Sequence, residues 1–118
     1  MANKRTIGFE KEQLAIQYVT SQGMTILEKN FYFRGGEIDL IGTENEYLCF
    51  IEVKYRTTNQ YGLPEDAITW EKQKKMIFGA KQYLYKQKLP FDTPCRFDTI
   101  TIYREHITWI RNAFELYF

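Results

Sequence analysis

Two short stretches decide the fold of this chain, GEIDLI at residues 36–41 and LCFIEVK at residues 48–54. The second is apolar along most of its length, which is typical of a central strand covered on both faces of its sheet. Glu52 and Lys54 interrupt it, and because side chains two apart on a strand share a face, both project to the same side. Burying an unpaired ion is costly. We therefore expect these charges to be compensated by each other, by a metal ion or by a substrate.

Glu37 and Asp39 also share one face of their strand. A short polar connection makes the two strands neighbours and brings Asp39 opposite Glu52. One interpretation is a structural ion pair of Glu52 with Lys54 at a strand edge. The other is a divalent-cation site made of Asp39, Glu52 and the carbonyl of Val53, with Lys54 facing a phosphate. Carboxylate and carbonyl oxygens are ligands that Mg²⁺ and Mn²⁺ accept.

The arrangement of Asp39 followed by Glu52-x-Lys54 resembles the bipartite signature of the PD-(D/E)xK nuclease superfamily. With the flanking residues, and with CRFD at residues 95–98, the chain resembles the YraN-like family of small bacterial predicted endonucleases over nearly its whole length. Archaeal Holliday-junction resolvases are similar at a greater distance. The resemblance implies one restriction-endonuclease-like α/β domain over residues 1–118, with a mixed central β-sheet flanked by helices in the order α-β-β-β-α-β-β.

The same resemblance implies a metal-dependent endonuclease that hydrolyses DNA phosphodiester bonds, at branched or single-stranded structures. Asp39 and Glu52 would hold Mg²⁺ or Mn²⁺, while Lys54 would orient the attacking water and stabilise charge at phosphorus. Glu12 and Glu37 would bind the metal through water or would lie just outside its direct ligands. A non-catalytic nucleic-acid-binding or assembly module on the same scaffold is the alternative. Because junction-resolving relatives act as twofold dimers, a homodimer is a further expectation.

The first helix is expected over residues 6–22, with Gly23 ending it. Glu12 falls in the middle of its apolar face, where an acid needs compensation. A buried hydrogen bond or a mis-phased helical wheel would explain the same position. The predicted apolar residues are Gly8, Phe9, Ala15, Ile16 and Val19.

Five strands are expected over residues 24–33, 37–42, 47–55, 95–103 and 106–111, with paired glycines turning the first hairpin. A long helix is expected from Pro64 to about Lys88, because proline suits a first helical turn. Its predicted buried residues are Trp70, Ile77, Ala80 and Leu84.

The net charge of +1 is unevenly distributed. Residues 1–53 carry five basic and eight acidic side chains, and residues 54–88 carry eight basic and three acidic ones. An acidic half followed by a basic segment suits an anionic polymer delivered to a metal site, and it equally suits an ordinary solvated helix. Arg56 and Gln60, in the polar loop after the second stretch, are predicted nucleic-acid contacts, and the resemblance adds Lys72, which matches a lysine of the family pattern.

The composition, 44% hydrophobic and 26% charged, is that of a soluble globular protein. The chain has no apolar run that could cross a bilayer and no signal-peptide core, so we expect a cytoplasmic protein without a membrane partner. Cys49 and Cys95 are expected to be free thiols in strands, and no zinc-binding spacing is present. Arg96 and Asp98 are interpreted as a structural pair at a sheet edge, with a catalytic role for Asp98 as the alternative.

Overall fold

The computed structural model of the protein describes residues 4–57 and 68–115, with side chains from residue 8 onward. Within these residues the elements follow one another in the predicted order α-β-β-β-α-β-β. They are α1 (Lys4–Ser21), β1 (Thr25–Phe33), β2 (Gly36–Glu44), β3 (Tyr47–Arg56), α2 (Trp70–Lys86), β4 (Cys95–Tyr103) and β5 (His106–Phe114).

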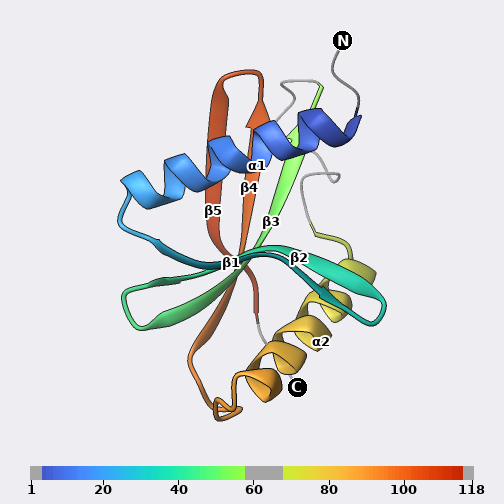
Figure 1. Cartoon of the computed structure of the whole chain (residues 1–118), viewed down its shortest axis with the longest axis vertical. Coiled ribbons are helices and arrows are strands. Elements are labelled where there is room, and N and C mark those ends of the chain that lie inside the picture. Colours follow the sequence, from blue (N-terminus) through green and yellow to red (C-terminus); the bar gives the residue numbers. More distant parts are fainter. Residues whose placement is uncertain (1–3, 58–67, 116–118) are drawn as a thin grey trace.

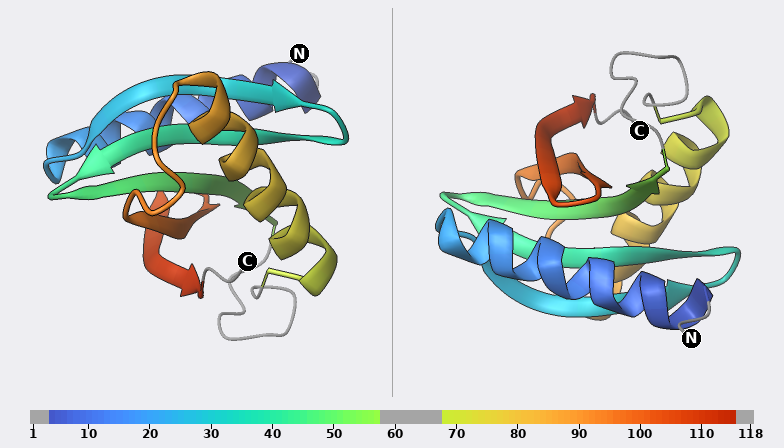
Figure 2. Two further views of the ribbon diagram at one scale, coloured as in Figure 1. Left: turned by 90° about the horizontal axis from the view of Figure 1, so that it is seen from below. Right: turned by 90° about the horizontal axis from the view of Figure 1, so that it is seen from above.

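The strands form one mixed sheet in the order β1-β2-β3-β4-β5. β1 with β2, β2 with β3, and β4 with β5 pair antiparallel, whereas β3 and β4 pair in parallel. The parallel pair requires a crossover, and α2 supplies it. The sheet is strongly twisted, with α1 across one face and α2 against the other (Figures 1 and 2). The predicted mixed sheet flanked by helices is confirmed.

The core consists of two apolar clusters, one on each face of the sheet. Ala15 and Val19 of α1 belong to the cluster that contains Ile51 of β3, and Leu84 of α2 belongs to the cluster that contains Phe50. Neighbouring residues of β3 thus fill opposite faces. This double burial explains the continuous apolar run at the centre of the sequence.

Two details of the predicted α1 and α2 are wrong. Phe9 is 62% exposed, because it lies roughly 120° around the helix from Ala15 at 100° per residue. Trp70 is 55% exposed, although it shares a face with Ile77, because it is the first residue of α2 and the buried positions begin at Met76.

The start of α2 also differs from the prediction. Thr69 is its N-cap, and its hydroxyl accepts a hydrogen bond from the Lys72 N–H at 3.2 Å. Ile68 and Thr69 precede the helix. Pro64, the predicted first residue, lies outside the described residues.

Two glycines make room for the Phe33 ring between the β1–β2 hairpin and α2. A Cβ atom at Gly79 would lie 2.5 Å from Phe33 Cε1, and one at Gly36 would lie 2.8 Å from Phe33 Cζ. The ring also packs against Phe31, with centroids 6.3 Å apart. The hairpin can approach α2 this closely only because residue 79 has no side chain.

Asp98 is fully buried in β4 with its carboxylate satisfied by four hydrogen bonds. It accepts from Arg96 Nε and Nη2, both at 2.9 Å, from Trp109 Nε1 at 3.0 Å, and from the Asn112 N–H at 2.9 Å. These bonds support the structural interpretation of Arg96 and Asp98. The predicted position at a sheet edge is wrong, because β4 pairs with β5 and is therefore not an edge strand.

Glu44 at the end of β2 extends this network. It accepts from Arg96 Nη2 at 2.7 Å and from Arg111 Nε and Nη2 at 2.8 and 2.9 Å. The Arg111 guanidinium in turn stacks on Trp109, 3.6 Å from the ring centroid. The bonds from Arg111 and Arg96 hold the pKa of Glu44 at about 2, below its ordinary 4.5.

Close packing at Gly79 predicts opposite effects for two Gly→Ala changes in helices. Gly79→Ala should lower the free energy of unfolding by about 1–3 kcal/mol, because the new methyl group overlaps Phe33. Gly8→Ala should raise it by about 0.5–1 kcal/mol, because nothing lies within 4 Å of the new atom and alanine favours the helix. Urea unfolding measures both, and stabilisation by Gly79→Ala would contradict the packing.

The Glu44 network predicts a pH-dependent contribution to stability. Because the folded-state pKa is lowered, the contribution is complete above pH 4.5 and is lost as the pH falls toward 2. Glu44→Gln should therefore cost about 2 kcal/mol at pH 7 and much less near pH 2. Urea unfolding across this range measures the difference in free energy of unfolding between wild type and Glu44→Gln, with Glu46→Gln in the adjacent turn as control. A difference that does not change with pH would exclude the ion pairs as its cause.

Candidate functional site

The candidate site lies where β2 and β3 stop pairing. Their register runs from Glu44 opposite Tyr47 to Leu40 opposite Ile51, so Asp39 and Glu52 are the next positions along the two strands. Here Asp39 Oδ2 accepts the Val53 N–H at 2.8 Å. A carboxylate of β2 thus accepts a hydrogen bond from the backbone of β3. The two predicted metal ligands, Asp39 and Glu52, lie on adjacent strands.

The side chains of β2 change sides at Asp39. Ile38 packs in the cluster under α2, whereas Leu40 packs in the cluster under α1, although residues two apart on a regular strand share a face. On the neighbouring strand Asn30 has a positive φ of 53°, a conformation that asparagine tolerates better than most residues. This irregularity turns the Asp39 carboxylate toward the backbone of β3.

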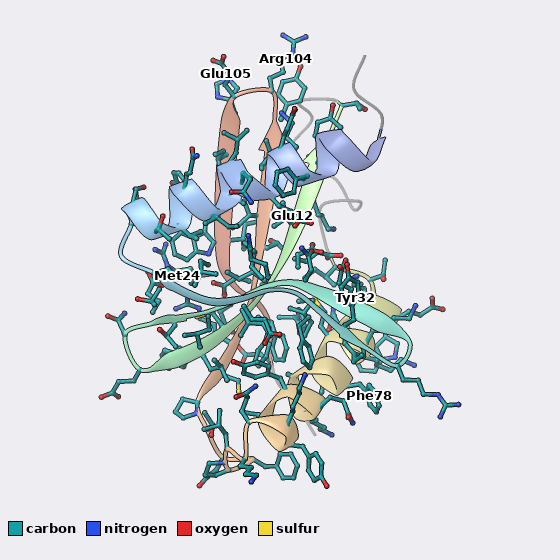
Figure 3. The ribbon with its side chains drawn as sticks, in the orientation of Figure 1. Glu12, Met24, Tyr32, Phe78, Arg104 and Glu105 are labelled. Carbon is teal, nitrogen blue, oxygen red and sulfur yellow. The ribbon has the colours of Figure 1, made fainter. Side chains whose placement is uncertain are left out.

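Asn30 also connects the two glutamates of the site. With its amide nitrogen turned toward the carboxylates, it donates to Glu12 Oε1 at 3.1 Å and to Glu37 Oε2 at 3.2 Å. Glu12 comes from α1, on the side of the helix turned toward the sheet (Figure 3). The predicted meeting of Glu12 and Glu37 near Asp39 therefore depends on a residue that the sequence analysis did not single out. Its sequence signal is weak, because Glu28 and Lys29 of the same strand are polar as well.

The four acids influence one another electrostatically. Burial raises the pKa of Asp39 to about 7 against the Val53 hydrogen bond, and the charges of Glu12, Glu37 and Glu52 raise it as well. Burial and the charge of Glu37 also raise the pKa of Glu12, while Asn30 and Lys29 lower it. Like charges gathered in a partly buried place are uncommon unless function retains them.

Glu52 is held from the α2 side of the sheet. Its Oε1 lies 3.1 Å from Lys72 Nζ. Its Oε2 is buried and has no hydrogen-bond partner among the residues that the structure describes. Lys54 follows Glu52 on the same face of β3. Lys72, predicted to contact a phosphate, is thus placed directly on a predicted metal ligand.

The oxygen ligands of the site have the chemistry that a hard divalent cation requires. Oxygen ligands from Asp39, Glu52 and the Val53 carbonyl suit Mg²⁺ or Mn²⁺, and the buried Glu52 Oε2 is an acceptor that a cation would satisfy. Across residues 4–57 and 68–115, however, no three His, Cys, Asp or Glu side chains are gathered closely enough to share one ion. The indirect binding predicted for Glu12 and Glu37, which Asn30 engages, stays a prediction.

The remaining predicted residues are less informative. Arg56 is half-buried at the end of β3, and Gln60 lies outside the described residues.

Cys49 and Cys95 are free thiols, and burial raises their pKa values to about 12 and about 11. Both thiols therefore remain protonated at neutral pH and are poor nucleophiles. No helix in the described part of the chain is long and apolar enough to span a membrane.

Together, the fold and the site define a mixed α/β domain with an acidic cluster where two central strands part. The model of the Uncharacterised protein family UPF0102 matches residues 11–102. The chain belongs to this family.

Relatives in the family match almost end to end. A UPF0102 protein of Lachnoclostridium phytofermentans is 48% identical over 115 residues, covering 98% of each chain. A UPF0102 protein of Saccharophagus degradans is 39% identical over 116 residues, again covering 98% of each. One from Coxiella burnetii is 41% identical over 111 residues, covering 93% of this chain and 92% of the relative.

The crowding of like charges predicts that neutralising Asp39 stabilises the metal-free protein. Because the folded-state pKa is raised from 3.8 to about 7, the wild type should lose stability as the pH rises through this window. Asp39→Asn removes that loss and can still accept the Val53 N–H. In EDTA at pH 8 it should be more stable than wild type by about 2 kcal/mol, with little gain near pH 4.

Urea unfolding at the two pH values measures this difference. Glu105→Gln, an exposed acid in the β4–β5 turn, is the matched control and should change little. A destabilised Asp39→Asn at pH 8 would mean that the acidic cluster is balanced by compensating charges.

Proposed function

We propose that this protein is a divalent-metal-dependent endonuclease of the PD-(D/E)xK superfamily that hydrolyses DNA phosphodiester bonds. The observation that supports it best is the meeting of Asp39 and Glu52 on adjacent strands with two lysines at the same place. Lys54 follows Glu52 on its own strand, and Lys72 contacts the Glu52 carboxylate. Acids that hold a cation and ammonium groups that face a phosphate are the parts such hydrolysis needs.

Each residue then has a distinct role. Asp39, Glu52 and the carbonyl of Val53 would hold Mg²⁺ or Mn²⁺, and Glu12 and Glu37 would add negative charge from the α1 side. When bound, the ion would supply a water of lowered pKa and neutralise phosphate charge. The hydrogen bond from the Val53 N–H fixes the Asp39 carboxylate against β3, which keeps its orientation independent of the ligand.

The lysines act on the phosphate side of the site. Lys54 orients the attacking water and stabilises the charge that develops at phosphorus in a partly buried place. Lys72 neutralises Glu52 in the metal-free protein, so a phosphate group that approaches Glu52 also meets the Lys72 ammonium. Cleavage in line with the leaving 3′ oxygen yields a 5′-phosphate.

The proposal includes a cellular compartment and an oligomeric state. Free, protonated thiols at Cys49 and Cys95 are the ordinary state in the reducing cytoplasm, where we place the protein. A branched DNA substrate with two symmetry-related strands would be cut by a homodimer, which has the matching twofold symmetry.

The proposed activity predicts metal-dependent nicking. Purified protein with Mn²⁺ should cleave branched or single-stranded DNA, and EDTA should stop the reaction. Asp39→Ala and Lys54→Ala should each lower the cleavage rate by about 10³-fold or more, because each removes charge stabilisation at the reacting phosphate. Glu105→Ala, remote from the site, should cleave normally. Gel analysis of end-labelled DNA gives the rates.

Thermal unfolding provides a readout that is independent of activity. Mn²⁺ should raise the unfolding temperature of the wild type but not that of Asp39→Ala, because a ligand stabilises only the state that binds it. Cleavage by Lys54→Ala at the wild-type rate would identify a contaminating nuclease. DNA binding that is indifferent to Mn²⁺ and never followed by cleavage would instead favour the non-catalytic binding module.

A further inference from the structure

Beside the acidic site, a basic and aromatic pocket lies between the tip of the β1–β2 hairpin and the first turns of α2. Its volume is about 510 Å³, which is within the range of pockets that bind small ligands or single groups of larger ones. Phe33 and Phe78 provide its aromatic wall, and its charged lining is Arg34, Lys74, Lys75 and Glu71. None of these residues was among the predicted nucleic-acid contacts.

The aromatic wall consists of one packed ring and one partly exposed ring. The Phe33 and Phe78 rings lie 5.9 Å apart at 53° to each other, and Phe78 is 45% exposed. The near contacts of Phe33 with Gly79 and Gly36 fix the inner ring. Phe78 projects from α2 below the hairpin that carries Tyr32 (Figure 3). A fixed inner ring with an exposed neighbour offers an apolar face to a planar group.

The charges of the pocket favour an anion. Arg34, Lys74 and Lys75 are exposed and face one acid, Glu71. A ligand that combines a planar apolar group with a negative charge therefore fits the lining. An unpaired nucleotide has both, since its base stacks on aromatic rings and its phosphate pairs with ammonium and guanidinium groups.

The pocket shares its two supporting elements with the acidic site. Lys72, which contacts Glu52, lies on the same turn of α2 as Glu71 and Lys74. On the hairpin, Gly36 opposite Phe33 is followed directly by Glu37. The pocket and the acidic site therefore adjoin along the same helix and hairpin.

We propose that this pocket binds an unpaired nucleotide of single-stranded DNA next to the phosphate at the acidic site. The inference rests on the proposed function for its substrate class, and it adds the place where an unpaired nucleotide of that substrate binds. A base held in a duplex is stacked on both faces and cannot reach Phe78, so the pocket selects a single strand or an unpaired end.

The test measures binding without metal, and therefore without cleavage. Fluorescence anisotropy with the full-length chain in EDTA should show binding of an oligo(dT) of about 12 nucleotides, a length within the usual site sizes of single-strand-binding proteins. Phe78→Ala should weaken it about tenfold, from the loss of base stacking. The double variant Lys74→Ala/Lys75→Ala should also weaken binding. The slope of log affinity against log salt concentration should become shallower by about 1.

Matched controls come from the far end of α2 and from the turn that follows it. Tyr85→Ala removes an exposed aromatic ring and Lys88→Ala an exposed charge, both outside the pocket, and both variants should bind as wild type does. An abasic oligonucleotide should bind more weakly than oligo(dT) and should show no further loss with Phe78→Ala. Circular dichroism melting confirms that each variant is folded.

The outcomes separate this inference from the proposed function. Equal affinity of wild type, Phe78→Ala and the lysine variant, or equal effects of Phe78→Ala on oligo(dT) and abasic DNA, would overturn the pocket assignment. A duplex that binds as tightly as oligo(dT) would overturn it as well. Pocket-dependent binding in a protein that never cleaves DNA with Mn²⁺ would sustain the pocket and refute the nuclease.

Discussion

Where β2 and β3 cease to pair, the Asp39 carboxylate accepts the Val53 N–H at 2.8 Å, in the position of a further backbone hydrogen bond. This bond gives the acid a fixed orientation between two central strands and ties it to the strand that carries Glu52. The cost is a partly buried carboxylate among like charges, and its pKa rises to about 7. Stability is thus given up at the site where we propose that a cation binds.

A comparison of two aspartates separates a structural carboxylate from one at the proposed site. Asp98 is completely buried, yet two bonds from Arg96 and one each from Trp109 and Asn112 satisfy it. Asp39 is surrounded by other carboxylates, and its one described hydrogen bond comes from the backbone. Two acids of the same type therefore have opposite surroundings. Only the second has a charge that a cation would compensate.

The arrangement of α2 connects the acidic site to the neighbouring surface. Lys72 neutralises Glu52 from one side of the helix, while Phe78, six residues further on, contributes to the pocket beside the hairpin tip. Gly79 permits the close approach of Phe33 that holds helix and hairpin together. Packing at one glycine thus positions both a counter-ion for the acids and the aromatic side of the pocket.

The sequence by itself determined the order of elements, the central position of β3 and the acids that meet, because apolar periodicity and charge within an apolar run depend only on neighbouring residues. The tertiary structure alone decided how the charges are compensated. The bonds from Asn30 to Glu12 and Glu37, and from Lys72 to Glu52, join residues from separate elements. The exposure of Phe9 and Trp70 and the pocket at Phe78 likewise depend on where each helix meets the sheet. Such contacts follow from packing between elements, which local sequence patterns do not encode.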